Sequence, residues 1–474
     1  MALVKDFSKI AGSSFINLLL GIVTTPLITR LVEPEQYGNW SLFTIYSNIL
    51  ASILLLGMDY IIVRYYYVYN DNAYRKQLIM WCILVPTTAI VLTFFPIILS
   101  LSRIRPTWSW FILFLLVVNV WVNVLNRLIN LILRFENKIN ILSITTILHK
   151  IIFVAIVITT LFCVSNYKFE VLSVATALST IITVFASVYF VRFLFLCCQN
   201  NIKYNLQKGE MISYGLPLMV SGCAYLLFQA TDKLVIGRFC SEKDLGIYSS
   251  AASFLSLFAI LQSSFTTVWW PSAMKNFECN SNDRSLYIKA NDTICFVMTM
   301  IGFTFIMAKD LIILLLGDHY RSAVVILPFI IFQPILYTIS ETTVVGLNFL
   351  KKSKAQLWIT ISSLAFNIGF NVVLTKYYGI IGTSIAVGLS YVFFLALRTI
   401  ISNYYFKVQY HFTKMYISVL LLFMLALIHT FFPGELFSYL IVAPFYITII
   451  AMYKDVVSFL YNKSLVFIKR DRRK

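Results

Sequence analysis

Two basic side chains, His149 and Lys150, interrupt an apolar stretch that runs from residue 140 to residue 163. In a helix that begins at residue 140, Lys150 would lie roughly 16 Å from the start. A lysine at that depth of a bilayer is costly unless it faces water, an anion or a carboxylate. It is therefore a candidate for binding an anionic group through its point charge. A structural pair with a carboxylate, or a helix that begins elsewhere, would also account for it.

Several arginines lie at the ends of apolar stretches. Arg127 is about two turns from the end of residues 108–133, and Arg134 follows on the same side. They form either a docking patch for an anion or a pair that reaches the lipid headgroups. Arg64 closes residues 39–62 and serves either substrate access or membrane anchoring. Arg30 lies at the end of the first apolar stretch, residues 10–31, and we expect it to have a mainly structural role.

Three carboxylates are expected near membrane depth: Asp59, Asp232 and Glu341. Such a group can bind a proton or Na⁺ and so drive a conformational cycle. Asp232 is adjacent to Lys233, which favours a local ion pair. Glu341 is the better coupling candidate, although it would equally neutralise a lysine such as Lys150. We expect no metal and no organic cofactor.

The composition indicates whether these side chains belong to a soluble protein or to a membrane protein. Of the 474 residues 59% are hydrophobic and only 12% are charged, and the mean hydropathy is +0.83. So few charges cannot coat a soluble protein of this length, which excludes a soluble enzyme. The net charge of +18 lies in short clusters between apolar runs, a pattern typical of a multi-pass membrane protein rather than of a nucleic-acid-binding one.

We expect an all-α protein with about fourteen membrane-spanning helices, since each crossing needs about 20 apolar residues. The expected spans are residues 10–31, 39–62, 78–101, 108–133, 140–163, 170–196, 213–236, 246–270, 291–316, 322–349, 355–375, 380–403, 414–432 and 437–461. With both termini in the cytoplasm, roughly 27 of the 38 lysines and arginines face inward, as the positive-inside rule requires. The basic tail at residues 469–474 would then contact the anionic inner leaflet.

The sequence repeats itself weakly. Residues 27–43 resemble residues 235–251, so that Arg30 aligns with Arg238. Two further weak similarities, in the same order along the chain, are between residues 133–147 and 349–363 and between residues 173–179 and 384–390. Repeats of this kind are typical of transporters. We therefore expect two parallel six-helix lobes and an appendix, listed in chain order: 1–205, 206–410 and 411–474.

Four sequence motifs resemble those of a known family. They are R-L-x-x-P-E-x-Y-G at 30–38, L-G-M-D-Y-I-I-V-R-Y at 56–65, D-K-L-V-I-G-R-F followed by G-I-Y at 232–248, and N-x-G-x-N-x-V-L-x-x-Y-Y-G-I-I-G-T-S-I-A at 367–386. The chain resembles the polysaccharide-export flippases, which include the O-antigen (Wzx-type) flippases of the multidrug/oligosaccharidyl-lipid/polysaccharide exporter superfamily. The resemblance implies alternating access through a cationic central cavity between two lobes.

The resemblance also implies a substrate and a location. The substrate would be an oligosaccharide repeat unit on undecaprenyl diphosphate, moved across the bacterial cytoplasmic (inner) membrane for O-antigen, capsule or exopolysaccharide synthesis. Membrane lipids, a polymerase and a chain-length regulator would be its partners, and nucleic acid would not. A diphosphate and its sugars would then contact the basic side chains singled out above: Lys150, His149, Arg127, Arg64 and Arg30.

Other functions remain open at this point. A drug/cation antiporter of the same superfamily usually has twelve spans and an acidic or aromatic cavity, unlike the basic residues here. A membrane polymerase or ligase needs a large exposed catalytic segment, whereas no loop between the expected spans exceeds about 20 residues. We therefore expect no enzymatic activity. A purely structural scaffold would have no use for costly charges within its spans.

Overall fold

The computed structural model describes most of the chain, namely residue 21 and residues 23–69, 71–136, 138–163, 167–192, 204, 206–279, 283–459, 461 and 462. Helices are the regular structure throughout this part, and it contains no strand. Internal contacts divide the chain into unit 1 (Met1–Ala230) and unit 2 (Thr231–Lys474). The two units are described separately below.

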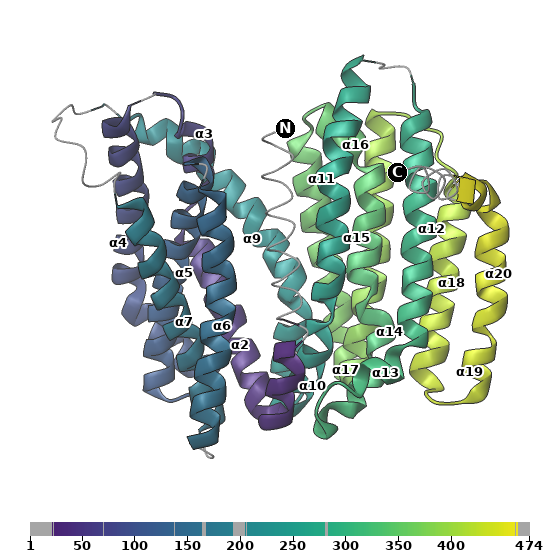
Figure 1. Cartoon of the computed structure of the whole chain (residues 1–474), viewed down its shortest axis with the longest axis horizontal. Helices are drawn as coiled ribbons and strands as arrows, with labels where there is room; N and C mark the ends of the chain where they lie inside the picture. The colour runs from purple at the N-terminus through teal and green to yellow at the C-terminus, as the bar shows by residue number, and fades with distance from the viewer. Residues whose placement is uncertain are drawn as a thin grey trace, which may run out of the picture. The chain divides into compact units, whose positions relative to one another are not determined.

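Unit 1 is a helical bundle built around α5 (Figure 1). After the helical residues 23–31, its elements are α2 (Pro34–Leu54), α3 (Met58–Tyr65), α4 (Asn72–Ile104), α5 (Trp110–Phe135), α6 (Ile139–Cys163), α7 (Lys168–Val191) and the first part of α9 (Lys208–Phe239). Ser109 begins α5, because its side chain accepts a hydrogen bond from the backbone N–H of Ile112. The buried face of α5 packs against α2, α4, α6 and α7.

The second expected span is bent rather than straight. Its two parts, α2 and α3, meet at an angle of 53°. Leu56 and Gly57 both have positive φ there, 53° and 76°. A Cβ at Gly57 would clash with the carbonyl group of Gly215 in α9. Glycine therefore permits both the left-handed turn and the close approach of α3 to α9.

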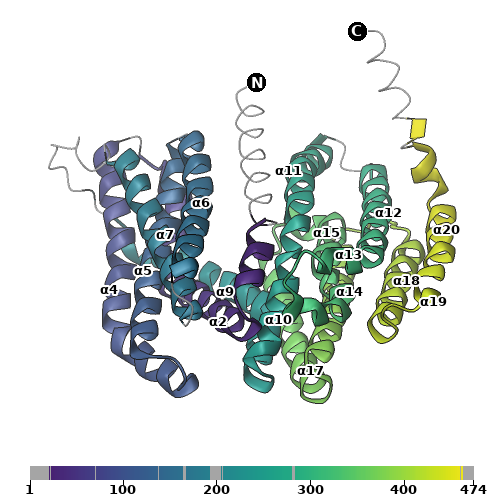
Figure 2. The same cartoon turned by 60° about the horizontal axis from the view of Figure 1, so that its bottom comes forward.

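Unit 2 contains the remaining helices. They are the end of α9, α10 (Glu242–Ser253), α11 (Leu255–Cys279), α12 (Ser285–Met307), α13 (Lys309–Ile313), the 3-10 helix η1 (Asp318–Val325), α14 (Leu327–Ile330), α15 (Phe332–Thr343), α16 (Val345–Phe349), α17 (Ser353–Tyr405), α18 (Phe412–Phe431), α19 (Leu436–Leu440) and α20 (Val442–Met452). Both α18 and α20 pack against α12, and they lie beside it in both views (Figure 2).

The 53-residue α17 is a hairpin of two antiparallel helices. The break is at Gly379, whose φ of 58° favours glycine. The Ser390 hydroxyl lies 3.3 Å from Oδ1 of Asn367, and the rings of Phe366 and Phe393 stack with their centroids 4.2 Å apart. These pairs hold the two arms together. The arms correspond to the separate spans expected at 355–375 and 380–403.

The number of spans is not fully determined by the described residues. Nine helices there are long and apolar enough to cross a membrane, and two bent pairs raise that number to eleven. Counting the arms of α17 separately adds one more, and the 17-residue apolar segment Leu436–Met452 is shorter. Most of the first expected span, 10–31, lies outside the described residues. The count of fourteen stays a prediction, whereas the all-α, multi-pass architecture is confirmed.

The sequence repeat has a structural counterpart. The helix of unit 1 that contains Arg30 ends at residue 31, and α9 ends at Phe239, which is 208 residues later. The next helices begin at Pro34 and at Glu242, again 208 residues apart. The aligned stretches therefore form the same helix–turn–helix corner in each unit. The contact boundary after Ala230 lies within α9, and the expected three-part division at 205 and 410 stays a prediction.

Candidate functional site

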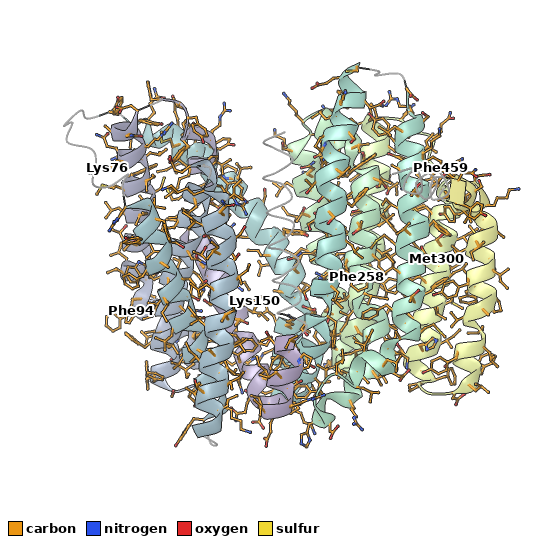
Figure 3. The ribbon with its side chains drawn as sticks, viewed as in Figure 1. Lys76, Phe94, Lys150, Phe258, Met300 and Phe459 are labelled. Carbon is orange, nitrogen blue, oxygen red and sulfur yellow. The ribbon has the colours of Figure 1, made fainter. Side chains whose placement is uncertain are left out.

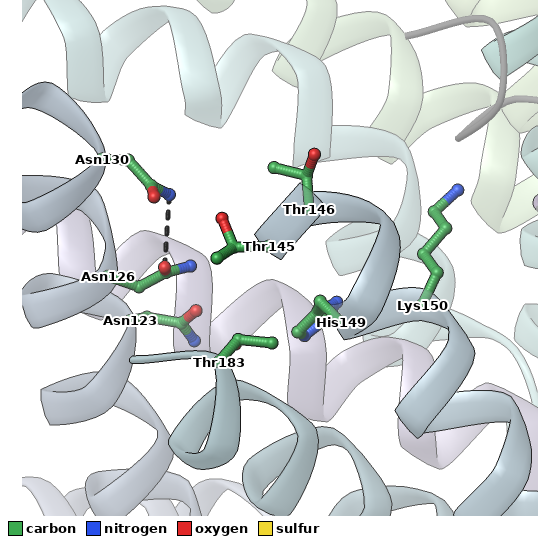
Figure 4. A pocket seen from close by; sticks show the side chains of 8 residues that line it. All are labelled: Asn123, Asn126, Asn130, Thr145, Thr146, His149, Lys150 and Thr183. Carbon is green, nitrogen blue, oxygen red and sulfur yellow. Dashed lines mark hydrogen bonds between the residues drawn. The ribbon is translucent and has the colours of Figure 1, made fainter. Parts of the chain in front are cut away.

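Unit 1 contains a polar cavity of about 260 Å³ between α5, α6 and α7 (Figure 4). It is lined by eight residues: Asn123, Asn126, Asn130, Thr145, Thr146, His149, Lys150 and Thr183. Six of these side chains are amides or hydroxyls, the other two are His149 and Lys150, and none is a carboxylate. Amides and hydroxyls both donate and accept hydrogen bonds, so the cavity can satisfy the hydroxyl groups of a polar ligand within a membrane-spanning bundle.

The asparagines form a row along one face of α5. Asn119, Asn123, Asn126 and Asn130 follow at intervals of four, three and four residues, which is the repeat of a single helix face. Asn119 and Asn123 donate to the hydroxyl of Ser47 at 2.9 and 3.2 Å. The side-chain amide of Asn130 donates to Oδ1 of Asn126 at 3.2 Å. None of these four asparagines was a predicted site residue, although their helical spacing within an apolar stretch is visible in the sequence.

His149 and Lys150 are the two predicted residues that line this cavity. Nε2 of His149 lies 3.3 Å from the hydroxyl of Thr180 and 3.4 Å from that of Ser179, both on α7. The stem of Lys150 borders the cavity, and its amine points away from the asparagines (Figure 4). A Cβ at Gly21 would lie 3.1 Å from that amine. Lys150 is about midway along α6 (Figure 3), which fits the expected depth.

A second cavity of about 420 Å³ lies between α3 and α5 and shares Asn130 with the first. Its other lining residues are Asp59, Tyr60, Val63, Arg127, Leu131 and Arg134. The structure thus brings two predicted arginine and carboxylate candidates, Arg127 and Asp59, into one place. Their guanidinium and carboxylate groups are 2.9 Å apart, and Arg127 also donates to the Ser52 hydroxyl at 3.1 Å.

Exposure separates the two members of this pair. The side chain of Asp59 is 9% exposed, whereas that of Arg127 is 46% exposed. The guanidinium can therefore neutralise the buried carboxylate and still present donors to the cavity. Arg134, on the same side of α5, is exposed and lines the same cavity.

The other two carboxylates have partners within unit 2. Glu341 on α15 is 3.0 Å from the guanidinium of Arg398 on α17 and accepts a hydrogen bond from the indole of Trp270 at 3.0 Å. Asp232 on α9 accepts from the Tyr248 hydroxyl at 2.6 Å and from the backbone N–H of Lys233 at 2.8 Å. Asp232 also interacts electrostatically with Lys233, its neighbour in the chain, and the expected local ion pair stays a prediction.

The remaining predicted residues lie at helix ends. Arg64 is exposed in the last turn of α3, and Arg30 is exposed at the end of the helix formed by residues 23–31. Arg238, which aligns with Arg30, is likewise exposed near the end of α9. In the part of the chain that the structure describes, no group of three or more His, Cys, Asp or Glu side chains could hold a metal ion.

The sequence profile of one protein family matches residues 3–277, which is more than half of the chain. That family is described as polysaccharide biosynthesis protein. The chain belongs to this family. The match includes unit 1 from residue 3 onward and both of its polar cavities, together with the start of unit 2. No curated protein sequence matches the chain.

Solved structures share the fold at low sequence identity. A structure titled lipid II flippase MurJ in an inward closed conformation aligns with a TM-score of 0.68 and 15% identity, over 96% of this chain and 99% of that chain. An inward-facing multidrug resistance MATE family transporter aligns with a TM-score of 0.58 and 16% identity, over 84% and 96%. The chain therefore has a MurJ/MATE-like fold, as the resemblance implied.

Proposed function

We propose that this protein flips undecaprenyl-diphosphate-linked oligosaccharide repeat units across the bacterial cytoplasmic membrane, for the synthesis of a surface polysaccharide such as O-antigen or capsule. The main support is the pair of adjoining cavities in unit 1, one lined by amides and hydroxyls and the other by arginines. Membership of a polysaccharide biosynthesis family and a MurJ/MATE-like fold support the same proposal.

The substrate presents a clear physical problem. Its polyprenyl tail is stable in lipid, whereas each sugar hydroxyl and each phosphate charge loses hydration in the hydrocarbon layer. Asn123, Asn126 and Thr183 offer hydrogen bonds that replace that hydration for the sugars. Arg127 and Arg134 offer charge-assisted bonds to the diphosphate. Neighbouring cavities would therefore accommodate the two chemically different parts of one headgroup.

The arrangement favours an anionic, sugar-containing substrate over a cationic drug. A cation site would place carboxylates against the ligand, but the eight residues around the first cavity include none. In the second cavity the one carboxylate, Asp59, is already paired with Arg127. Lys150 adds a positive charge at the edge of the first cavity. A drug/cation antiporter is thus the less suitable proposal.

Coupling to a proton or Na⁺ is assigned to Asp59 in this proposal, ahead of Glu341 and Asp232. Asp59 is the carboxylate that lines a substrate cavity, and its protonation would release Arg127 for a phosphate group. Glu341 and Asp232 are held by Arg398 and Tyr248 and fit structural roles. Arg64 and Arg30, exposed at helix ends, fit substrate access and the anchoring of those ends.

The first test uses cells that lack the gene and carry plasmid-borne variants. Lys150→Met and Asn126→Leu should each reduce surface polymer at least about tenfold, since each loses polar interactions with the headgroup. Lys354→Met, at an exposed position in the first turn of α17 and outside both cavities, is the matched control and should keep normal polymer. Polymer is measured on gels, and membrane abundance by immunoblot. Normal polymer in both cavity variants would refute the proposal.

A further inference from the structure

A third cavity in unit 1 has no role in the proposed transport. It is a groove of about 930 Å³ along α4 and α5, separate from the two polar cavities. Its lining is mainly apolar and aromatic: Met80, Trp81, Ile83, Leu84, Trp121, Leu125 and Leu206. Met80 and Leu84 are more than half exposed, and Trp121 is 41% exposed. In a bilayer, apolar side chains exposed along a membrane-spanning helix face lipid chains rather than water.

One end of this groove is polar and basic. Gln77, Tyr204 and Lys208 line it, and the Lys208 amine lies 6.0 Å from the centre of the Trp81 ring. Gln77 accepts a hydrogen bond from the backbone N–H of Tyr204 at 2.9 Å, which fixes this end against α4. The residue before Gln77 is Lys76, a second positive charge at the same helix end.

The length of the groove matches one leaflet of a bilayer. From Gln77 to Thr87 it follows ten residues of α4, or about 15 Å, which is half of the roughly 30 Å hydrocarbon core. The expected topology places the start of α4 at the cytoplasmic face, where the anionic lipids of the inner leaflet are found. The groove thus extends from the headgroup level at Lys208 to the middle of the membrane.

From this match we infer that the groove binds one anionic phospholipid of the cytoplasmic leaflet, with its phosphate at Lys208 and an acyl chain between Trp81 and Trp121. The positive charge of Lys208 complements the negative charge of the lipid phosphate. The apolar part of the groove is about as long as an acyl chain that spans one leaflet. A polyprenyl tail is longer than this groove and would leave most of its length outside. Lys208 is the first residue of α9, so a bound phosphate would fix the start of that helix against α4.

The binding test uses the purified full-length chain in detergent, with native mass spectrometry and added phosphatidylglycerol or phosphatidylethanolamine. We expect one phosphatidylglycerol per chain to be retained more strongly than phosphatidylethanolamine. Lys208→Glu should weaken phosphatidylglycerol binding at least about fivefold, because it reverses the charge at the headgroup. Lys354→Glu, an exposed lysine in the first turn of α17, is the matched control and should bind as the wild type does.

A second variant tests the apolar part of the site. Leu84→Trp fills the groove without changing its charge, so it should weaken the binding of both lipids to a similar extent. The unfolding temperature of this variant should stay near that of the wild type. If the Leu84→Trp protein does not fold, Met80→Trp serves as the groove-filling variant instead. Equal binding of the two lipids, with no effect of Lys208→Glu, would overturn the inference. Displacement of phosphatidylglycerol by undecaprenyl phosphate would overturn it too, because the groove would then hold a polyprenyl chain.

Discussion

The ion pair between Arg127 and Asp59 is the interaction on which the site depends most at the scale of single residues. Its carboxylate is buried, so it must stay neutralised, and its guanidinium is half exposed beside the second cavity. The sequence identified both residues as candidates in separate roles. It could not show that they pair, because side-chain pairing between helices depends on helix rotation, which hydropathy does not define.

A double substitution separates the structural role of Arg127 from its proposed role in binding. Arg127→Met leaves the Asp59 carboxylate buried without its cation, so we expect a loss of about 1–3 kcal/mol, less than for a fully buried pair. The unfolding temperature in detergent should fall by several degrees. Adding Asp59→Asn should restore most of that stability. An Arg127→Met protein as stable as the wild type would contradict this view of the pair.

The same double variant has a functional readout. With stability restored, Asp59→Asn/Arg127→Met lacks the guanidinium that we assign to the diphosphate, whereas Asp59→Asn alone keeps it and is the control for loss of the coupling carboxylate. Surface polymer should therefore be lower in the double variant than in Asp59→Asn alone, at equal membrane abundance. Equal polymer in the two variants would show that Arg127 serves only to neutralise Asp59.

At the scale of elements, hydropathy predicted most of the long helices that the structure describes, but not their bends. The stretches 39–62 and 322–349 each read as one apolar run, yet the first bends by 53° at Gly57 and the second by 60° after η1. The bend at Gly57 depends on α9, which approaches from far along the chain, so no local pattern predicts it. The asparagine row of α5, in contrast, follows from spacing alone and was available in the sequence.

The contact between α3 and α9 gives a test at this scale. Gly57→Ala places a Cβ in left-handed backbone and against the Gly215 carbonyl group, so it should destabilise the protein by at least about 1 kcal/mol. The matched control is Gly369→Ala, in a helical position with open space around it. Alanine there should be neutral or stabilising by up to about 1 kcal/mol. Unfolding temperatures in detergent measure both, and equal values for the two variants would contradict the argument.

At the scale of the whole molecule, the weak sequence repeat proved more informative than any single residue. The equal 208-residue spacing of two helix ends and two helix starts supports a duplicated architecture, and the fold is that of MurJ and MATE structures. The sequence could not reveal how the polar side chains divide between two cavities. That division depends on α5 presenting Asn130 to both, which requires α3, α6 and α7 to pack around it.

The most direct test of the central claim is headgroup translocation by the purified protein in liposomes. A fluorescent undecaprenyl-diphosphate oligosaccharide is incorporated, and its accessibility to a membrane-impermeant quencher is followed with time. The wild-type protein should bring substrate from the inner leaflet to the quencher much faster than empty liposomes, and Asn126→Leu should slow this at least about tenfold. Equal rates in empty and protein-containing liposomes, or an unaffected Asn126→Leu variant, would contradict a sugar headgroup crossing through the polar cavities of unit 1.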